Sequence, residues 1–176
     1  MRKIQIVAAA AAFVTLTLAG CSGEQIAGVP DRSLEAGAIV TSASVDRPWK
    51  GTCDVVANFT GPTTLLITGT CRITHLGKSD VVATQTIGPP DPVTGIIPFT
   101  NTAMYTAANG DNLSTSTVGF ATPSATGLTL SGVETANGGT GRFADATGSA
   151  ELTGAVVFTG PASTIGSFSV DGRLNY

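Results

Sequence analysis

The chain has 176 residues, of which only 12% are charged, and its formal net charge at pH 7 is −3. This length suits one small domain that can bury a core without help from metal ions. The weakly acidic balance provides no cationic surface, which argues against binding to nucleic acid or to an anionic bilayer by charge.

The first predicted element is a secretion signal over residues 1–20. Arg2 and Lys3 supply its positive start, and an apolar run with three polar interruptions covers residues 4–19. Small residues then lead directly into Cys21. The alternative is an uncleaved membrane anchor, but the run is shorter than the ~20 apolar residues that a spanning helix needs.

The sequence Leu18-Ala19-Gly20-Cys21 resembles the lipobox of bacterial lipoproteins. The resemblance implies that the Cys21 sulfur receives a diacylglyceryl group, that the signal is cut before it, and that the new N-terminus is acylated. Cleavage would leave 156 residues with a net charge of −5, so membrane attachment would depend on the lipid. Because Ser22 rather than Asp follows the cysteine, the resemblance favours the outer membrane in a Gram-negative cell. Residues 21–34 then form the lipidated N-terminus and a tether.

Residues 35–176 are predicted to form one all-β domain. Apolar and polar residues alternate repeatedly along this part, as half-buried strands require. This alternating pattern argues against a disordered secreted tail. Turn-forming residues separate the alternating stretches at Pro62, Asn109-Gly110-Asp111, Gly138-Gly139 and Gly160-Pro161. Eight extended segments are predicted near residues 49–59, 64–76, 80–87, 96–107, 113–120, 126–135, 149–158 and 164–174. Eight sequential strands favour an antiparallel up-and-down β-barrel, with a two-sheet β-sandwich as the alternative.

Two cysteines define the first hairpin. With Cys21 assigned to the lipid, Cys53 and Cys71 remain in an exported protein, where disulfides persist. A hairpin that turns at Pro62 places them directly opposite each other, close enough for a disulfide. This register also gathers the apolar residues of both strands on the cysteine face, and a slip of one residue would expose them.

Extending the same register predicts that His75 lies opposite Trp49 on the inward face. The only histidine and the only tryptophan would then meet near one end of the barrel. Together with Arg142, they form the candidate pocket predicted from the sequence.

Three short runs are distinctive: residues 74–78, residues 107–113 and the glycine run of residues 138–148. The glycine run, with Gly138-Gly139-Thr140-Gly141 followed by Phe143, is similar to a run in plant dirigent proteins and allene oxide cyclases. All three runs, in this order, resemble a set of uncharacterised bacterial secreted proteins. The resemblance implies an eight-stranded antiparallel barrel of the allene oxide cyclase kind. No catalytic residue can be carried over, because the shared run is scaffold rather than chemistry.

The glycine run has a structural interpretation that suffices. Gly138, Gly139 and Gly141 permit a tight chain reversal with positive φ, and Phe143 is suited to plug a barrel end. A phosphate-binding loop would need a following helix and usually a lysine. A calcium loop around Asn109-Gly110-Asp111 would need regularly spaced carboxylates, so this segment is better interpreted as a hairpin turn.

The remaining candidate residues give weak chemical signals. His75 could act as a general base or a metal ligand, but without a second histidine, a spare cysteine or a recognisable triad, a packed structural histidine is favoured. Arg142 could bind a carboxylate at the barrel mouth or simply face solvent. No metal or other cofactor is predicted.

The leading functional hypothesis is a non-catalytic, lipid-anchored envelope protein that binds a small apolar ligand or serves as an interaction module. One alternative is an enzyme that steers an apolar substrate, as its fold relatives do. The other is a structural surface protein without a cavity.

Overall fold

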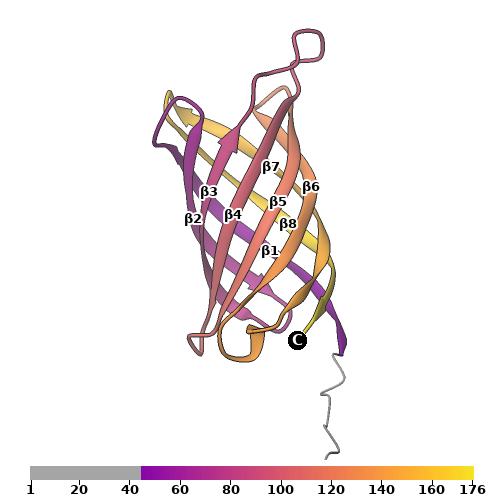
Figure 1. Cartoon of the computed structure of the whole chain (residues 1–176). Coiled ribbons are helices and arrows are strands. Elements are labelled where there is room, and N and C mark those ends of the chain that lie inside the picture. Colours follow the sequence, from indigo (N-terminus) through magenta and orange to yellow (C-terminus); the bar gives the residue numbers. More distant parts are fainter. Residues whose placement is uncertain (1–44) are drawn as a thin grey trace, which may run out of the picture. The chain divides into compact units, whose positions relative to one another are not determined.

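Residues 45–176, which the computed structural model describes, form a closed barrel of eight antiparallel strands (Figure 1). Each strand pairs with the next along the chain, and β8 closes the barrel on β1. The strands are β1 (Asp46–Phe59), β2 (Thr64–Ile73), β3 (Gly77–Ile87), β4 (Ile97–Ala107), β5 (Asn112–Pro123), β6 (Leu128–Gly139), β7 (Thr147–Gly160) and β8 (Ser163–Asn175), with a short 3₁₀ turn η1 (Gly141–Phe143) between β6 and β7. The up-and-down barrel is therefore confirmed and the sandwich alternative is wrong. Residues 1–44, including Cys21 and the proposed signal and tether, lie outside the described residues.

Strict alternation of side chains gives the sheet one buried face and one exposed face. Along β1, Cys53, Val55 and Ala57 are buried, whereas Asp54 and Val56 between them are exposed. Closure leaves no unpaired strand edge, so a chain with few charged residues avoids edge-to-edge association.

The two ends of the barrel are filled differently. The end that carries the C-terminus and the turns after β2, β4 and β6 is called here the closed end (Figure 1). Its large side chains are among the most deeply buried of the described residues: Trp49, Leu76, Leu113, Phe143 and Leu174. The opposite end, with the turns after β1, β3, β5 and β7, is called the hollow end.

Most of the predicted strand bounds differ from the observed ones by one to four residues, and two of the differences have a clear structural cause. The predicted strand over residues 64–76 ends at Ile73, because residues 74–76 form the turn to β3 and His75 has a φ of 68°. Gly138-Gly139, predicted as a turn, forms the end of β6, and the chain reverses after it around η1. The ladder between β5 and β6 shifts register between Leu113 and Thr115, which lets Gly139 pair with Leu113. The irregularity therefore moves the turn past the glycine pair.

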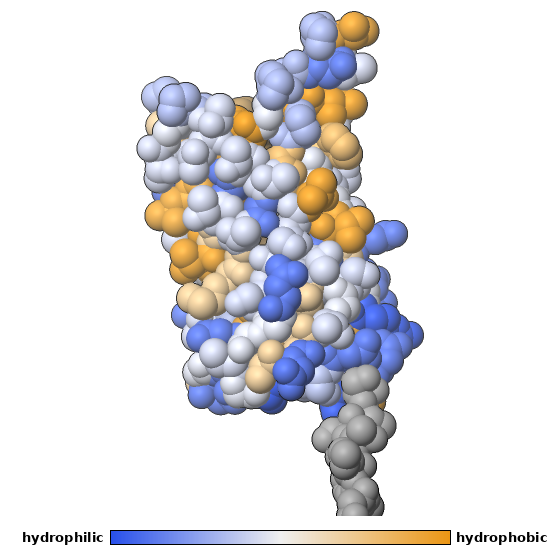
Figure 2. All heavy atoms as spheres, viewed as in Figure 1, coloured by the Kyte–Doolittle hydropathy of each residue, from blue (hydrophilic) through white to orange (hydrophobic). Residues whose placement is uncertain are grey.

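The outer face is mostly small and polar, with apolar side chains concentrated away from the closed end (Figure 2). Some of these side chains are cross-strand neighbours, such as Val82 with Met104 and Val118 with Val133. No helix among residues 45–176 has the length and apolar character needed to cross a membrane.

Candidate functional site

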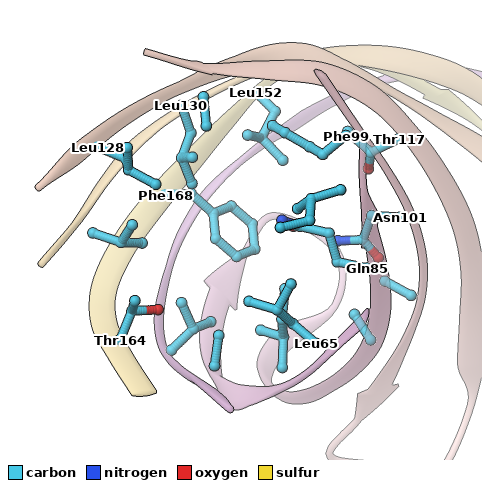
Figure 3. Close-up of a pocket in the computed structure, with 18 of the residues that line it drawn as sticks. Leu65, Gln85, Phe99, Asn101, Thr117, Leu128, Leu130, Leu152, Thr164 and Phe168 are labelled. Carbon is cyan, nitrogen blue, oxygen red and sulfur yellow. The ribbon is translucent and has the colours of Figure 1, made fainter. Parts of the chain in front are cut away.

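The hollow end encloses an apolar cavity of about 130 Å³ (Figure 3). All eight strands contribute to its wall, because inward positions alternate along each of them. Most of the wall is hydrocarbon, and its bulky apolar members include Phe59, Leu65, Phe99, Leu130, Leu152 and Phe168. Phe158, which also lines the cavity, is 56% exposed, so the cavity reaches the rim of the barrel.

Four polar residues cross one side of this apolar wall in a single row. Gln85 pairs in register with Asn101, Asn101 with Thr117, and Thr117 with Glu134, on the successive strands β3, β4, β5 and β6. All four line the cavity, and the side chains of Gln85 and Asn101 point into it in Figure 3. We call these residues the polar row. An apolar chamber with a few convergent polar groups is the usual form of a small-molecule site.

Glu134 is the centre of a buried hydrogen-bond network. Its side chain is 1% exposed, and its Oε1 accepts hydrogen bonds from the Tyr105 hydroxyl at 2.8 Å and the Thr115 hydroxyl at 2.6 Å. Its other oxygen, Oε2, is buried without a hydrogen-bond partner among the described residues. Tyr105 packs against the closed end and also lines the cavity, so it fixes the carboxyl at the floor of the chamber.

This network changes the titration of both acids. Burial raises the pKa of the Glu134 carboxyl above its ordinary value, and the hydrogen bonds from Thr115 and Tyr105 oppose the rise. Burial also raises the pKa of the Tyr105 hydroxyl well above its ordinary value, and the adjacent Glu134 carboxyl adds to that rise. A perturbed acid in a cleft is a common mark of a functional site.

The predicted disulfide is confirmed at the closed half of the barrel. Cys53 and Cys71 are bonded across β1 and β2, and each is 1% exposed. The predicted register is confirmed along the whole hairpin, from Gly51 opposite Ile73 to Phe59 opposite Leu65.

The predicted extension of this ladder to a Trp49–His75 pair is wrong. Pairing of β1 with β2 ends at Gly51 and Ile73, and Trp49 instead lies opposite Gly172 of β8. Trp49 is fully buried at the closed end. His75 is a half-buried residue of the turn after β2, and the centre of its ring lies 6.0 Å from the centre of the Tyr176 ring. The left-handed backbone at His75 breaks the strand geometry that the extension assumed.

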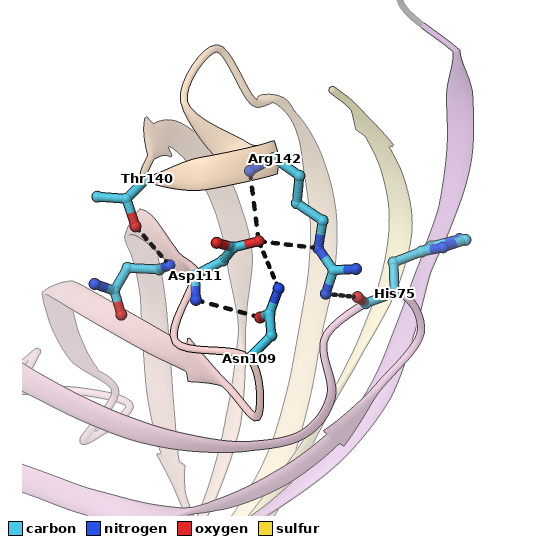
Figure 4. A network of polar contacts seen from close by, with 6 residues as sticks. His75, Asn109, Asp111, Thr140 and Arg142 are labelled. Carbon is cyan, nitrogen blue, oxygen red and sulfur yellow. Dashed lines mark hydrogen bonds and ion pairs between the residues drawn. The ribbon is translucent and has the colours of Figure 1, made fainter. Parts of the chain in front are cut away.

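Arg142 holds the turns of the closed end together (Figure 4). Its Nη2 donates to the His75 backbone oxygen at 2.6 Å, and its Nε lies 3.6 Å from Oδ2 of Asp111. The guanidinium also lies 4.8 Å from the centre of the Phe143 ring. Arg142 thus binds a carboxylate of its own chain and links the turns that follow β2, β4 and β6.

The glycine run shapes the same end. Gly138 and Gly141 have positive φ values of 82° and 56°, which glycine adopts without strain. Phe143 follows these glycines in the sequence and precedes β7, and its side chain is fully buried. The centre of its ring lies 4.9 Å from the centre of the Tyr176 ring.

Trp49, His75 and Arg142, the pocket residues predicted from the sequence, therefore do not line the cavity. Glu134 is not among the residues predicted from the sequence, although a signal for it was present. One face of β6 carries Leu128, Leu130, Glu134 and Ala136, so a carboxyl group lies in an otherwise apolar row. The exposed Val133 beside it is an apolar residue on the opposite face of β6, and it makes the signal from the inward face less clear.

Within residues 45–176, no three His, Cys, Asp or Glu side chains lie together as ligands of a metal ion. A scan against models of protein families and a search of curated proteins both found no match to this sequence.

Proposed function

We propose that the barrel binds one small apolar ligand in the cavity of its hollow end. The cavity itself carries this proposal. Its volume of about 130 Å³ is close to that of an engineered apolar protein cavity of ~150 Å³ that binds benzene. A bound apolar molecule would make dispersion contacts with the wall that the lining residues do not make with one another. The cavity argues against the alternative of a solid structural barrel.

Titration with toluene, followed by NMR of leucine methyl groups, tests the proposal. We expect saturable shifts at Leu130 and Leu152, which line the cavity. Leu113 and Leu174, buried at the closed end, serve as internal controls and should shift much less. Shifts that are absent, or that are equal at both ends, would rule out a ligand site in the hollow end.

We further propose that the protein is exported and held at the cell envelope by lipid on Cys21, in the outer membrane if the cell is Gram-negative. The lipobox-like sequence supports this proposal. Wild-type protein should incorporate radiolabelled palmitate and fractionate with membranes, whereas Cys21→Ser should do neither. Labelling of the Cys21→Ser protein, or a soluble wild type, would contradict the assignment.

One observation favours the second candidate, an enzyme that steers an apolar substrate. Glu134 presents an acid with a raised pKa to the cavity, which is what a proton donor in an apolar site requires. The resemblance of the glycine run to dirigent proteins and allene oxide cyclases points the same way. Stereoselective cyclisation or coupling of an unsaturated apolar substrate, lost in Glu134→Gln, would establish this candidate over simple binding.

A further inference from the structure

The cavity wall contains two buried oxygens that no group of the described barrel satisfies. They are Oε2 of Glu134 and Oδ1 of Asn101, and both residues belong to the polar row. A buried polar atom without a partner costs about 1–3 kcal/mol, and folded proteins contain few of them. Because both side chains border a chamber large enough for a small molecule, a ligand is well placed to supply the missing hydrogen bond.

Glu134 is the better anchor of the two. Its Oε1 is held by Tyr105 and Thr115, so the orientation of the carboxyl is fixed, and Oε2 of this cavity-lining residue is the oxygen without a partner among the described residues. Asn101 lies two strands away, about 10 Å from Glu134 at the strand spacing of a sheet, and has no comparable support among the side-chain hydrogen bonds of the described residues. A polar group with two firm hydrogen-bond partners and one free atom positions a ligand without reorganising.

We propose that the cavity selects apolar ligands that carry a hydroxyl group, an alcohol or a phenol, and that the hydroxyl binds Oε2 of Glu134. A hydroxyl suits this atom in either protonation state, because it donates to an ionised carboxylate and accepts from a protonated carboxyl. An ammonium group would lose its hydration in a chamber whose other walls are mostly hydrocarbon, which disfavours a cationic ligand. The inference rests on the proposed function, since it names the ligand class of the same cavity.

The test compares two ligands of nearly equal shape, phenol and toluene, by the same methyl NMR titration. Wild-type protein should bind phenol roughly 10- to 100-fold more tightly than toluene, the range expected for one hydrogen bond to an acidic group. In Glu134→Gln, the amide oxygen can still accept hydrogen bonds from Tyr105 and Thr115, and an amide nitrogen takes the place of Oε2. In the other orientation of the amide, the oxygen and the nitrogen exchange places. The amide nitrogen can still donate to the phenol oxygen, but this neutral hydrogen bond is weaker than one to an acidic group. The preference for phenol should therefore fall by roughly threefold to tenfold in this variant, with toluene affinity changed little.

Glu151→Gln is the matched control, because Glu151 is an exposed glutamate on the neighbouring strand β7, opposite Val133 on the outer face. It should keep the wild-type preference for phenol. Equal affinities of the wild type for phenol and toluene, or an unchanged preference in Glu134→Gln, would overturn the inference and leave the proposed function intact. If neither ligand shifts the methyl groups of the cavity, the proposed function fails and the inference fails with it.

Discussion

At Glu134, the stability of the barrel and the proposed binding of a ligand in its cavity make opposite demands. The carboxyl is 1% exposed, and one of its oxygens is unpaired among the described residues. An apolar residue of similar size would avoid this desolvation cost, yet it would leave the hydroxyls of Tyr105 and Thr115 without their acceptor. The residues of a buried wall are normally apolar, and residues that depart from this pattern are expected at functional sites. Glu134 departs from it.

Glu134→Gln should stabilise the protein increasingly as the pH rises. The pKa of this carboxyl is raised in the folded state, so the folded protein binds its proton more tightly than the unfolded chain does. The resulting contribution to stability is fully present below the unfolded pKa of about 4.5 and is lost as the pH rises through the folded pKa. Glutamine does not titrate, so the difference in the free energy of unfolding between the variant and the wild type should move in favour of the variant as the pH rises.

Urea unfolding between pH 4.5 and 8.5, followed by Trp49 fluorescence, measures this difference. Trp49 is the only tryptophan and is fully buried, so its emission should shift to the red on unfolding. Glu151→Gln should show no such trend, because Glu151 is exposed. A Glu134→Gln difference that stays constant over this range would mean that the carboxyl titrates normally in the fold.

At the scale of elements, the hairpin of β1 and β2 was predictable because three independent signals agree on it. Pro62 marks the turn, the apolar row defines the inward face, and Cys53 and Cys71 fix the register. The extension to Trp49 and His75 failed because it relied on the register alone. A residue with left-handed backbone conformation, such as His75, ends the pairing of two strands, and the pattern of apolar residues in the sequence does not reveal it.

Reduction of the disulfide should destabilise the barrel by about 3 kcal/mol. The bond joins residues 18 positions apart, and the chain-entropy model assigns a crosslink of that length roughly this value. Oxidised and reduced wild-type protein have the same sequence, including the same residues around the cavity. A comparison of their urea midpoints therefore measures the contribution of the crosslink alone. The mass difference of two daltons verifies the redox state, and identical midpoints would contradict the prediction.

At the scale of the whole molecule, the barrel divides into a packed half and a hollow half. Bulky side chains fill the closed end, whereas the cavity occupies the hollow end even though its walls are apolar. The sequence could predict the barrel, because alternation and turn residues extend along the whole domain. It could not predict which half is hollow, because the cavity depends on how the side chains of eight strands meet at one level.

Enlarging one alanine in each half tests this division. Ala121 lines the cavity, and Ala107 lies in the packed core at the end of β4 near the closed end. Ala121→Leu should place its added carbons in empty space, so the free energy of unfolding should stay level or rise by up to about 1 kcal/mol. Ala107→Leu has no such space and should lose about 1–3 kcal/mol through overpacking.

Ligand binding should respond in the opposite order. Ala121→Leu occupies the volume that the ligand needs and should weaken toluene binding at least tenfold, whereas Ala107→Leu should leave it within about twofold. A variant that gains stability while it loses the ligand is the expected signature of a cavity kept open for binding at the expense of packing. Equal losses of stability in both variants would instead show that the hollow end is packed as tightly as the closed end in solution.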